Sequence, residues 1–475
     1  MRVTKSGILA YGIVLAALIV AATLFCYLTT ERLTPQRLNV ILIVVDTLRA
    51  DHLETYGYSR NTAKNIAKLA EDGILFKNAI APASWTRPSI ASIMTSMYPS
   101  SHGAVGRMGE LDDKYLTIQE ILKEHGYATV GFNSNGNAGK FWNFDQGFDF
   151  FNHAPMTRGY KGEKLQSPAS SITDRGKAWV YDNPTERPFF LYLLYIDPHA
   201  PYFTDEEFQF NKSYKGKNNG SLEQLKEIDW NRRLSEDGQE IPGIMEECNY
   251  VKDLYDAEIA YTDKHIGRLM GFLHEFNLYE NTLIILTADH GEGLWDHDNR
   301  GHGEDIYQEQ LHIPLIIRCP GIKGGKRISN YVSTIDILPT VLDIVGIRPP
   351  AHFQGVSLLP MMLGKRAKEG VLLVEEQLDE RDFTGVIKDG WKLIYDRAHD
   401  SYELYDLRKD RKEKQNLANS NDHSIEKIFR NLSLILHKKT EENKEIRNRM
   451  KPSEPAQERE IPEELKEKLR ALGYI

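Results

Sequence analysis

The sequence predicts an α/β protein: a mainly parallel, mixed sheet sandwiched between helices, with a small C-terminal antiparallel sheet and an N-terminal transmembrane helix. Apolar runs suited to buried strands alternate with stretches of helical periodicity such as NTAKNIAKLAEDG. After about residue 350, short alternating runs such as GWKLIYD and YELYDL follow, a pattern typical of antiparallel strands. The apolar runs are 38–45, 128–132, 188–195, 282–287 and 313–317.

The N-terminal helix is predicted from residues 7–28, an uncharged apolar run long enough to cross a bilayer. Arg2 and Lys5 precede it, as in a signal anchor or signal peptide, which disfavours a buried soluble helix. No clear cleavage site follows the run, which favours an anchor that is not cleaved. We expect a single-pass, uncleaved anchor in the cytoplasmic membrane, with residues 1–6 in the cytoplasm. The remaining chain would then lie on the periplasmic or extracellular side.

The rest of the chain divides into three predicted parts. Residues 38–350 form the main domain, 351–415 a small α+β subdomain, and 416–475 a charged helical tail rich in Lys, Glu, Arg and Asn. Residues 203–250 interrupt the regular alternation with charged and aromatic text. Such a segment is either a functional lid or a disordered insertion, and the sequence favours neither.

Composition excludes some classes of function. The chain has 68 acidic against 59 basic residues and a formal net charge of -9, so it offers no broad basic surface for nucleic acid. Its 3 cysteines are widely scattered and form no CxxC pair, which argues against a disulfide framework.

Polar residues follow two of the predicted strands. Asp46 ends the first run, and Asp289 and His290 follow the run 282–287 in TADHGEG. Because ligands of open α/β sheets bind beyond the carboxyl ends of the strands, these three side chains could hold a divalent cation. Taken singly, Asp46 could instead cap a helix, and DHG could be a tight turn.

Thr86 lies in PASWTRPSIAS, just before a predicted helix that Pro88 begins. The free N–H groups and the dipole of a helix N-terminus favour an anion, so a hydroxyl held there and bound to a metal would be a deprotonatable nucleophile. The alternative is that Thr86 or Ser84 only caps the helix.

Two further segments carry histidines. YIDPHAPY supplies Asp197 and His199, and the glycine-rich loop after DHG supplies His302, our preferred candidate there, with Asp296 and the more doubtful His297. Imidazoles beside a metal site can bind an anionic oxygen or donate a proton. Convergence of Asp197, His199 and His302 on a second ion is a weaker alternative, because their spacing is incomplete.

Taken in order, these residues resemble the sulfatase branch of the alkaline-phosphatase-like superfamily. The resemblance rests on NVILIVVDTLRADHLETYGY, YIDPHAPY, LYDAEIAYTDKHIG, TADHGEG, STIDILPTVLDIVG and GVSLLP, and the closing ELYDL and LRALGY are similar to frequent C-terminal text of the family. It implies that His199 and His302 lie near the sulfate or phosphate oxygens. It also implies one divalent cation surrounded by Asp46, Thr86, Asp289 and His290.

The chain departs from the family at the nucleophile. The sulfatase signature is Cys (or Ser)-x-Pro-Ser-Arg, whose first residue becomes formylglycine, whereas the matching text here is Thr86-Arg87-Pro88-Ser89-Ile90. Threonine is not a substrate for that modification. The substitution resembles the Thr-nucleophile members of the superfamily, such as the phosphoethanolamine transferases and lipoteichoic acid synthases, which are likewise membrane-anchored.

The predicted function is therefore a metal-dependent hydrolase of sulfate or phosphate esters that acts through Thr86, with phosphoester chemistry favoured. A phosphoryl-group transferase is the first alternative, and a catalytically silent relative that binds anionic glycans or lipids is the second. His290 favours Mn²⁺ or Zn²⁺ over Ca²⁺ or Mg²⁺. The expected partners are an anionic ester (glycan, lipid or small molecule) and the membrane, but not nucleic acid.

Overall fold

The computed structural model describes residues 38–153, 168–183, 187–202, 207–229, 234, 239, 241–366, 370–450 and 460–474. In these ranges no helix combines the length and the apolarity needed to span a bilayer. The predicted span 7–28 lies outside the described residues, so the membrane anchor stays a prediction.

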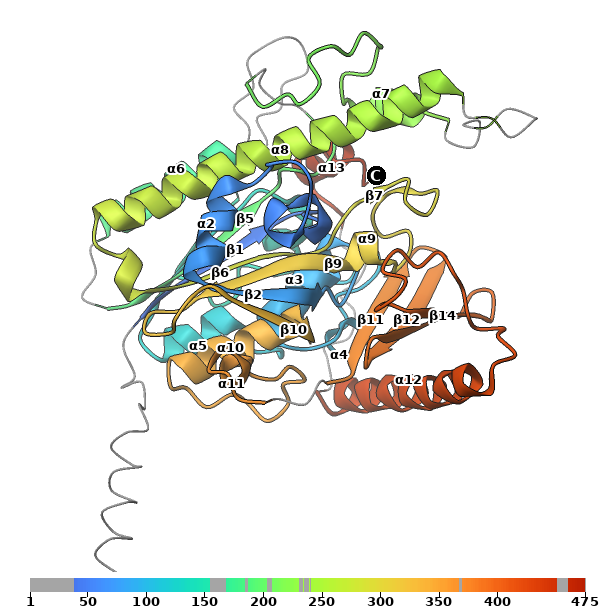
Figure 1. Ribbon diagram of the computed structural model, residues 1–475. Coiled ribbons are helices and arrows are strands. Elements are labelled where there is room, and N and C mark those ends of the chain that lie inside the picture. The colour runs from blue at the N-terminus through green and yellow to red at the C-terminus, as the bar shows by residue number, and fades with distance from the viewer. Residues whose placement is uncertain are drawn as a thin grey trace, which may run out of the picture.

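A large twisted sheet forms the centre of the fold (Figure 1). Among the described residues it has 8 strands, which in spatial order are β10 (Lys326–Ser333), β2 (Ile74–Ile80), β9 (His312–Arg318), β6 (Thr282–Ala288), β1 (Asn39–Val45), β5 (Phe189–Tyr195), β3 (Ala128–Asn133) and β4 (Phe150–His153). All seven residues of β1, of β5 and of β6 are buried, as expected for central strands with helices on both faces.

The sheet is mixed, as predicted, and mainly parallel. β1 runs parallel to β5 and β6, and β3 runs parallel to β4 and β5. The run 313–317, which the sequence grouped with the parallel strands, belongs to β9 and is antiparallel to both β6 and β2. A strand buried on both faces is an uninterrupted apolar run whether it is parallel or antiparallel to its neighbours, so the pattern does not reveal its orientation.

Helices cover both faces of the sheet (Figure 1). On one face α8 packs against α2 and α6, and on the other α3 packs against α5 and α10. The bounds are α2 (Lys64–Asp72), α3 (Thr86–Thr95), α5 (Ile118–Glu124), α6 (Pro168–Asp182), α8 (Pro242–Glu275) and α10 (Ile337–Ile344). Shorter elements are α4 (Pro99–His102), α7 (Leu222–Glu227), α9 (Gln308–Leu311), α11 (Leu359–Met362), β7 (Gly293–Leu294) and β8 (Arg300–Gly301).

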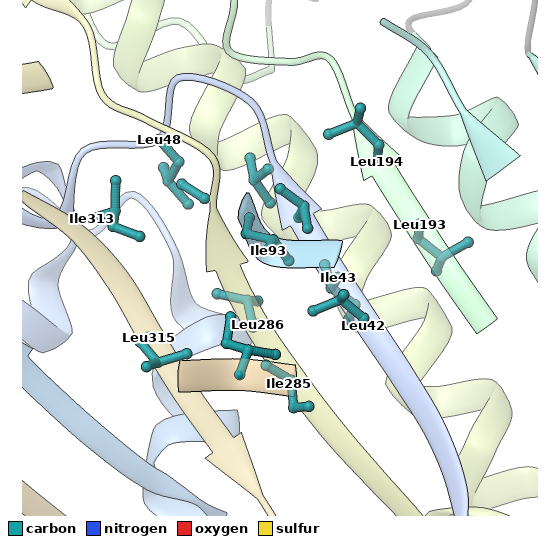
Figure 2. Close-up of a cluster of buried hydrophobic side chains, with 14 of the residues drawn as sticks. Leu42, Ile43, Leu48, Ile93, Leu193, Leu194, Ile285, Leu286, Ile313 and Leu315 are labelled. Atoms are coloured by element: carbon teal, nitrogen blue, oxygen red, sulfur yellow. The ribbon is translucent and has the colours of Figure 1, made fainter. Parts of the chain in front are cut away.

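The core lies where α3 crosses the central strands. Figure 2 shows Ile93 of α3 among side chains from β1, β5, β6 and β9. Fully burying an aliphatic side chain contributes about 1.5–3 kcal/mol. Since all ten residues of α3 are buried, this helix is fixed firmly against the sheet, and its first residue, Thr86, is held in place.

The predicted small antiparallel sheet is confirmed. Its strands are β11 (Leu372–Leu378), β12 (Arg381–Lys388), β13 (Trp391–Asp396) and β14 (Ser401–Asp406), and α12 (His423–Met450) packs across β12 and β13. A second helix of the tail, α13 (Glu463–Ala471), lies away from α12, on the far side of the molecule (Figure 1). The exact boundaries at 350 and 415 stay predictions.

A buried ion pair links the small sheet to the main domain. Lys392 Nζ lies 2.7 Å from the Glu413 carboxylate, both side chains are fully buried, and the same ammonium donates to the Ile306 carbonyl at 2.5 Å. The carboxylate in turn accepts from the Gln308 backbone N–H at 2.7 Å. The pair thus connects β13 to the loop that leads into α9.

We expect Lys392→Ala to lower the free energy of unfolding by about 3–5 kcal/mol, because it leaves the Glu413 carboxylate buried without its cation. Urea unfolding followed by circular dichroism measures the change. The matched control is Lys409→Ala, since the Lys409 side chain is 86% exposed and its ion pair contributes little. Equal stability of the two variants would contradict a structural role for the buried pair.

Candidate functional site

The site begins with the register of three strands. Val45 of β1 pairs with Tyr195 of β5 on one side and with Ala288 of β6 on the other. Parallel strands end at the same edge of the sheet, so the residues that follow β1 and β6 leave it at one level. Asp46 and Asp289 therefore meet, and both are fully buried.

His290 completes a group that could hold a metal ion. Its ligand atom and one oxygen each of Asp46 and Asp289 all lie within 4.8 Å of one another. Nδ1 of His290 donates to the Gly291 carbonyl at 2.8 Å, which leaves the Nε2 lone pair facing the carboxylates. Nε2 lies 3.5 Å from Asp46 Oδ1 and 3.5 Å from Asp289 Oδ2, so three electron-rich atoms face one point.

The electrostatics of these three residues fit a divalent cation. Burial and the neighbouring Asp289 carboxylate raise the pKa of Asp46 well above its ordinary value, and burial raises the pKa of Asp289 to about 7. Burial also lowers the pKa of His290, which keeps the imidazole neutral. Asp46 Oδ1 and Asp289 Oδ2 have no hydrogen-bond partner among the described residues, and a cation between them would satisfy both.

Thr86 is the first residue of α3 and is fully buried. The sequence placed it just before the helix, but Trp85, with extended backbone, is the capping position and makes no side-chain cap. Thr86 Oγ1 instead lies 3.4 Å from His290 Nε2 and accepts from Asn135 Nδ2 at 3.1 Å. Ser84 does not cap the helix either, because its hydroxyl donates to Glu376 at 2.6 Å.

His199 and His302 face each other beside Thr86, with ring centroids 4.8 Å apart. Nδ1 of His199 donates to the Ala200 carbonyl at 2.5 Å, and Nδ1 of His302 lies 3.1 Å from Glu292 Oε1. Burial lowers the pKa of His302, but the carboxylates of Glu292, Asp289 and Glu376 together raise it by more, so its pKa lies above the ordinary value. The Nε2 atoms of both rings point into the site.

Sequence reasoning missed two residues of the site. Asn135 Nδ2 bridges Asp46 Oδ2, at 2.5 Å, and Thr86 Oγ1. It was detectable, because SNGN (134–137) directly follows β3, and the rule that selected Asp46, a polar residue beyond the end of a buried strand, also selects Asn135. Tyr474 Oη lies 3.2 Å from Thr86 Oγ1. Tyr474 ends the closing LRALGY that resembles C-terminal text of the family, but nothing in that text indicated a place in the site.

The other candidate residues from the sequence make structural hydrogen bonds and ion pairs. The Asp197 carboxylate accepts from the Ala169 backbone N–H at 2.9 Å, so its position does not support a second metal site with His199 and His302. Asp296 pairs with Arg49 at 2.6 Å. His297 pairs with Glu309, also at 2.6 Å.

A cavity of about 340 Å³ opens beside the site. Cationic side chains outnumber acidic ones in its lining by 5 to 3, and Trp85 and Trp142 supply aromatic surface. Excess positive charge in a concave, partly aromatic pocket suits an anionic ligand with an apolar or cyclic part. The charged lining residues are Arg87, Arg107, Lys226, Arg300 and Arg381 against Glu292, Glu304 and Asp379.

Two family profiles and several known proteins match this chain. Residues 38–347 match the profile of the family described as Sulfatase, and residues 297–445 match the profile described as N-sulphoglucosamine sulphohydrolase, C-terminal. Arylsulfatase K of Homo sapiens is 28% identical over 365 residues, which cover 68% of this chain and 66% of that protein. The chain thus matches slightly less than two-thirds of the length of this curated relative.

Solved structures share the fold. One is described as being in complex with its substrate D-glucosamine-2-N,6-O-disulfate, and it has a TM-score of 0.69 at 22% identity. The match covers 86% of this chain and 98% of that protein's chain. The phosphonate monoester hydrolase of Agrobacterium radiobacter has a TM-score of 0.67 at 21% identity, and the match covers 87% of this chain and 96% of that one.

We expect Mn²⁺ to raise the melting temperature of chelator-treated protein by a few degrees, because an ion at 100 times its Kd stabilises the folded state by about 2.7 kcal/mol. In Asp289→Asn the shift should be lost, while the metal-free variant should melt no lower than metal-free wild type, since one of two facing carboxylates is gone. Differential scanning fluorimetry measures both. Asp389→Asn, in an exposed turn, is the matched control and should keep the full shift; a full shift in Asp289→Asn would contradict the site.

Proposed function

Because the chain belongs to the sulfatase family, we propose that it is a metal-dependent hydrolase of sulfate or phosphate esters with Thr86 as its nucleophile. Sulfatase-family enzymes are metal-dependent, and Asp46, Asp289 and His290 fit a cation. Among metals we favour Mn²⁺ or Zn²⁺, since an imidazole joins two carboxylates.

One observation carries the proposal: a buried hydroxyl stands at the N-terminus of a ten-residue helix, against the candidate metal group. Thr86 Oγ1 lies 3.4 Å from His290 Nε2, at a helix N-terminus, which favours an anion. An ordinary structural threonine has no need of two unpartnered carboxylate oxygens beside it.

The proposed reaction has two displacements. Thr86 Oγ1 loses its proton to solvent and attacks the phosphorus or sulfur of the ester, and the bond to the ester oxygen breaks. That oxygen leaves as an alcohol after it receives a proton from His199 or His302, and the histidine regains a proton from solvent. Water then attacks the resulting Thr86 ester, releases phosphate or sulfate and restores the hydroxyl. When bound, the cation supplies positive charge that favours the ionised hydroxyl.

We favour phosphoesters over sulfate esters. The formylglycine route of sulfatases needs a Cys or Ser at the position of Thr86. A threonine alkoxide can form a phosphothreonine that water resolves, and a relative of the same fold is named a phosphonate monoester hydrolase. The excess of cationic side chains in the cavity supports an anionic glycan, lipid or small molecule as substrate.

Two alternatives and the location stay open to experiment. A transferase would differ only in having an acceptor alcohol in place of water, and the predicted single anchor favours a hydrolase of exported substrates. A silent binding protein would not need the complete set of Asp46, Thr86, Asp289 and His290. We propose that the catalytic domain lies outside the cytoplasmic membrane, tethered by residues 7–28.

We expect Thr86→Ala to lower kcat for 4-nitrophenyl phosphate by about 10³-fold or more, because the attacking oxygen is gone. Thr86→Ser keeps a hydroxyl and should retain far more activity. Mass spectrometry of wild type quenched during turnover should find a phosphate or sulfate on the peptide that contains Thr86. Running 4-nitrophenyl sulfate in parallel decides between the two ester classes.

The matched control is Thr95→Ala, at the other end of α3, where the hydroxyl donates to the Ala91 carbonyl at 2.7 Å. It should keep its activity. Full turnover by Thr86→Ala on both esters would refute the nucleophile. Absence of activity in wild type on a broad ester panel, with added alcohol acceptors included, would favour the silent binding protein.

A further inference from the structure

Tyr474 places its hydroxyl among three side chains of the proposed reaction. Oη lies 3.2 Å from Thr86 Oγ1, 3.0 Å from His199 Nε2 and 3.3 Å from His302 Nε2. Its ring lies against both imidazoles, with centroids 5.4 Å and 5.7 Å away. The phenol thus satisfies the three polar atoms that an anionic ester would contact.

The phenol and a substrate cannot occupy this space together. An attacking oxygen approaches its target atom at about 3–3.5 Å, and the target carries further oxygens around it. An oxygen that is 3.2 Å from Thr86 Oγ1 and within hydrogen-bond distance of both imidazoles lies inside the volume of the reacting group. Substrate binding therefore requires Tyr474 to move.

The segment that carries Tyr474 is held by few contacts. In α13 and the turn after it, Leu469 and Leu472 are buried, and Leu465 and Leu469 lie against the turn at Gly136. Arg107 Nη1 donates to the Tyr474 carbonyl at 2.6 Å, but the Arg107 side chain is 51% exposed. Ion pairs on the outer face of α13 join residues of the same helix, for example Lys468 to Glu464 at 2.7 Å.

The same segment also forms a wall of the cavity. Leu469, Leu472, Gly473 and Tyr474 line it together with His199, His302 and the arginines described above. Its departure would join the cavity to Thr86 and the histidines. Two buried leucines and a few hydrogen bonds are a small contact, which binding of a dianion could displace.

We propose that residues 463–474 are a removable plug, in which Tyr474 competes with a tetrahedral oxyanion for the space beside Thr86, His199 and His302. The plug proposal rests on the proposed function, because the plug would hold the enzyme closed until an anionic ester displaces it. It differs from a catalytic role for Tyr474, because a catalytic phenol would have to remain in place when substrate binds.

The test is the binding of tungstate, an unreactive tetrahedral dianion, to metal-loaded full-length protein by isothermal titration calorimetry. If the plug is closed in most molecules, its removal raises the apparent affinity in proportion to the closed fraction. We expect Tyr474→Ala to bind tungstate about tenfold or more tightly than wild type. Leu469→Glu, which undocks α13 but keeps the phenol, should also bind more tightly.

Glu467→Ala, on the exposed face of α13, is the matched control and should bind like wild type. Unchanged or weaker binding by Tyr474→Ala would overturn the plug, and weaker binding would assign the phenol to the oxyanion site itself. If Leu469→Glu does not fold, amide hydrogen exchange in wild type decides: tungstate should speed exchange in 463–474, and slower exchange would contradict displacement.

Because tungstate binding needs no turnover, this result is independent of the nucleophile test. Active Thr86→Ala together with tighter tungstate binding by Tyr474→Ala would refute the proposed nucleophile and keep the plug. Inactive Thr86→Ala with no change on Tyr474→Ala would do the reverse.

Discussion

The structure depends on bringing two carboxylates to one buried point. The parallel register of β1 with β6 fixes Asp46 and Asp289 beside each other, and neither can turn to solvent. Two buried like charges without a counter-charge cost free energy, which the protein avoids only by binding a proton or a cation there. The raised pKa values of both residues express that cost. A site of this kind is costly to the fold unless a proton or a cation occupies it.

The surrounding helix and strand ends position further side chains around these two carboxylates. Ser89 in the first turn of α3 donates to the Asp289 carbonyl at 2.5 Å, so the helix that carries Thr86 is tied directly to the end of β6. Asn135, from the end of β3, holds the Asp46 carboxylate and the Thr86 hydroxyl with the same amide nitrogen. The ends of three strands and one helix therefore position the hydroxyl before any ligand binds, which lowers the entropy cost of the reacting geometry.

Much of this could be predicted from the sequence, because buried parallel strands and the polar residues that end them are local patterns. Asp46 and Asp289 each follow an uninterrupted apolar run. The direction of β9 could not be predicted, since burial on both faces removes the alternation that distinguishes strand types. The motif LRALGY includes Tyr474, but its contact with the site could not be predicted, because it depends on how α13 packs, 388 residues along the chain from Thr86, and no periodicity encodes that contact.

The departure from the sulfatase signature changes which groups can supply positive charge to an ester bound at Thr86. Ile90 stands where the signature has arginine and is fully buried, so it provides no charge. Arg87 is no substitute: its guanidinium lies 3.4 Å over the Trp142 ring, and Nη1 donates to the carbonyls of Gly106, Arg107 and Gly109. Burial lowers its pKa to about 9, yet it stays charged at neutral pH and clamps the 106–109 loop beside the cavity. With those donors committed to the backbone, the charge that a bound ester meets at Thr86 must come chiefly from the cation.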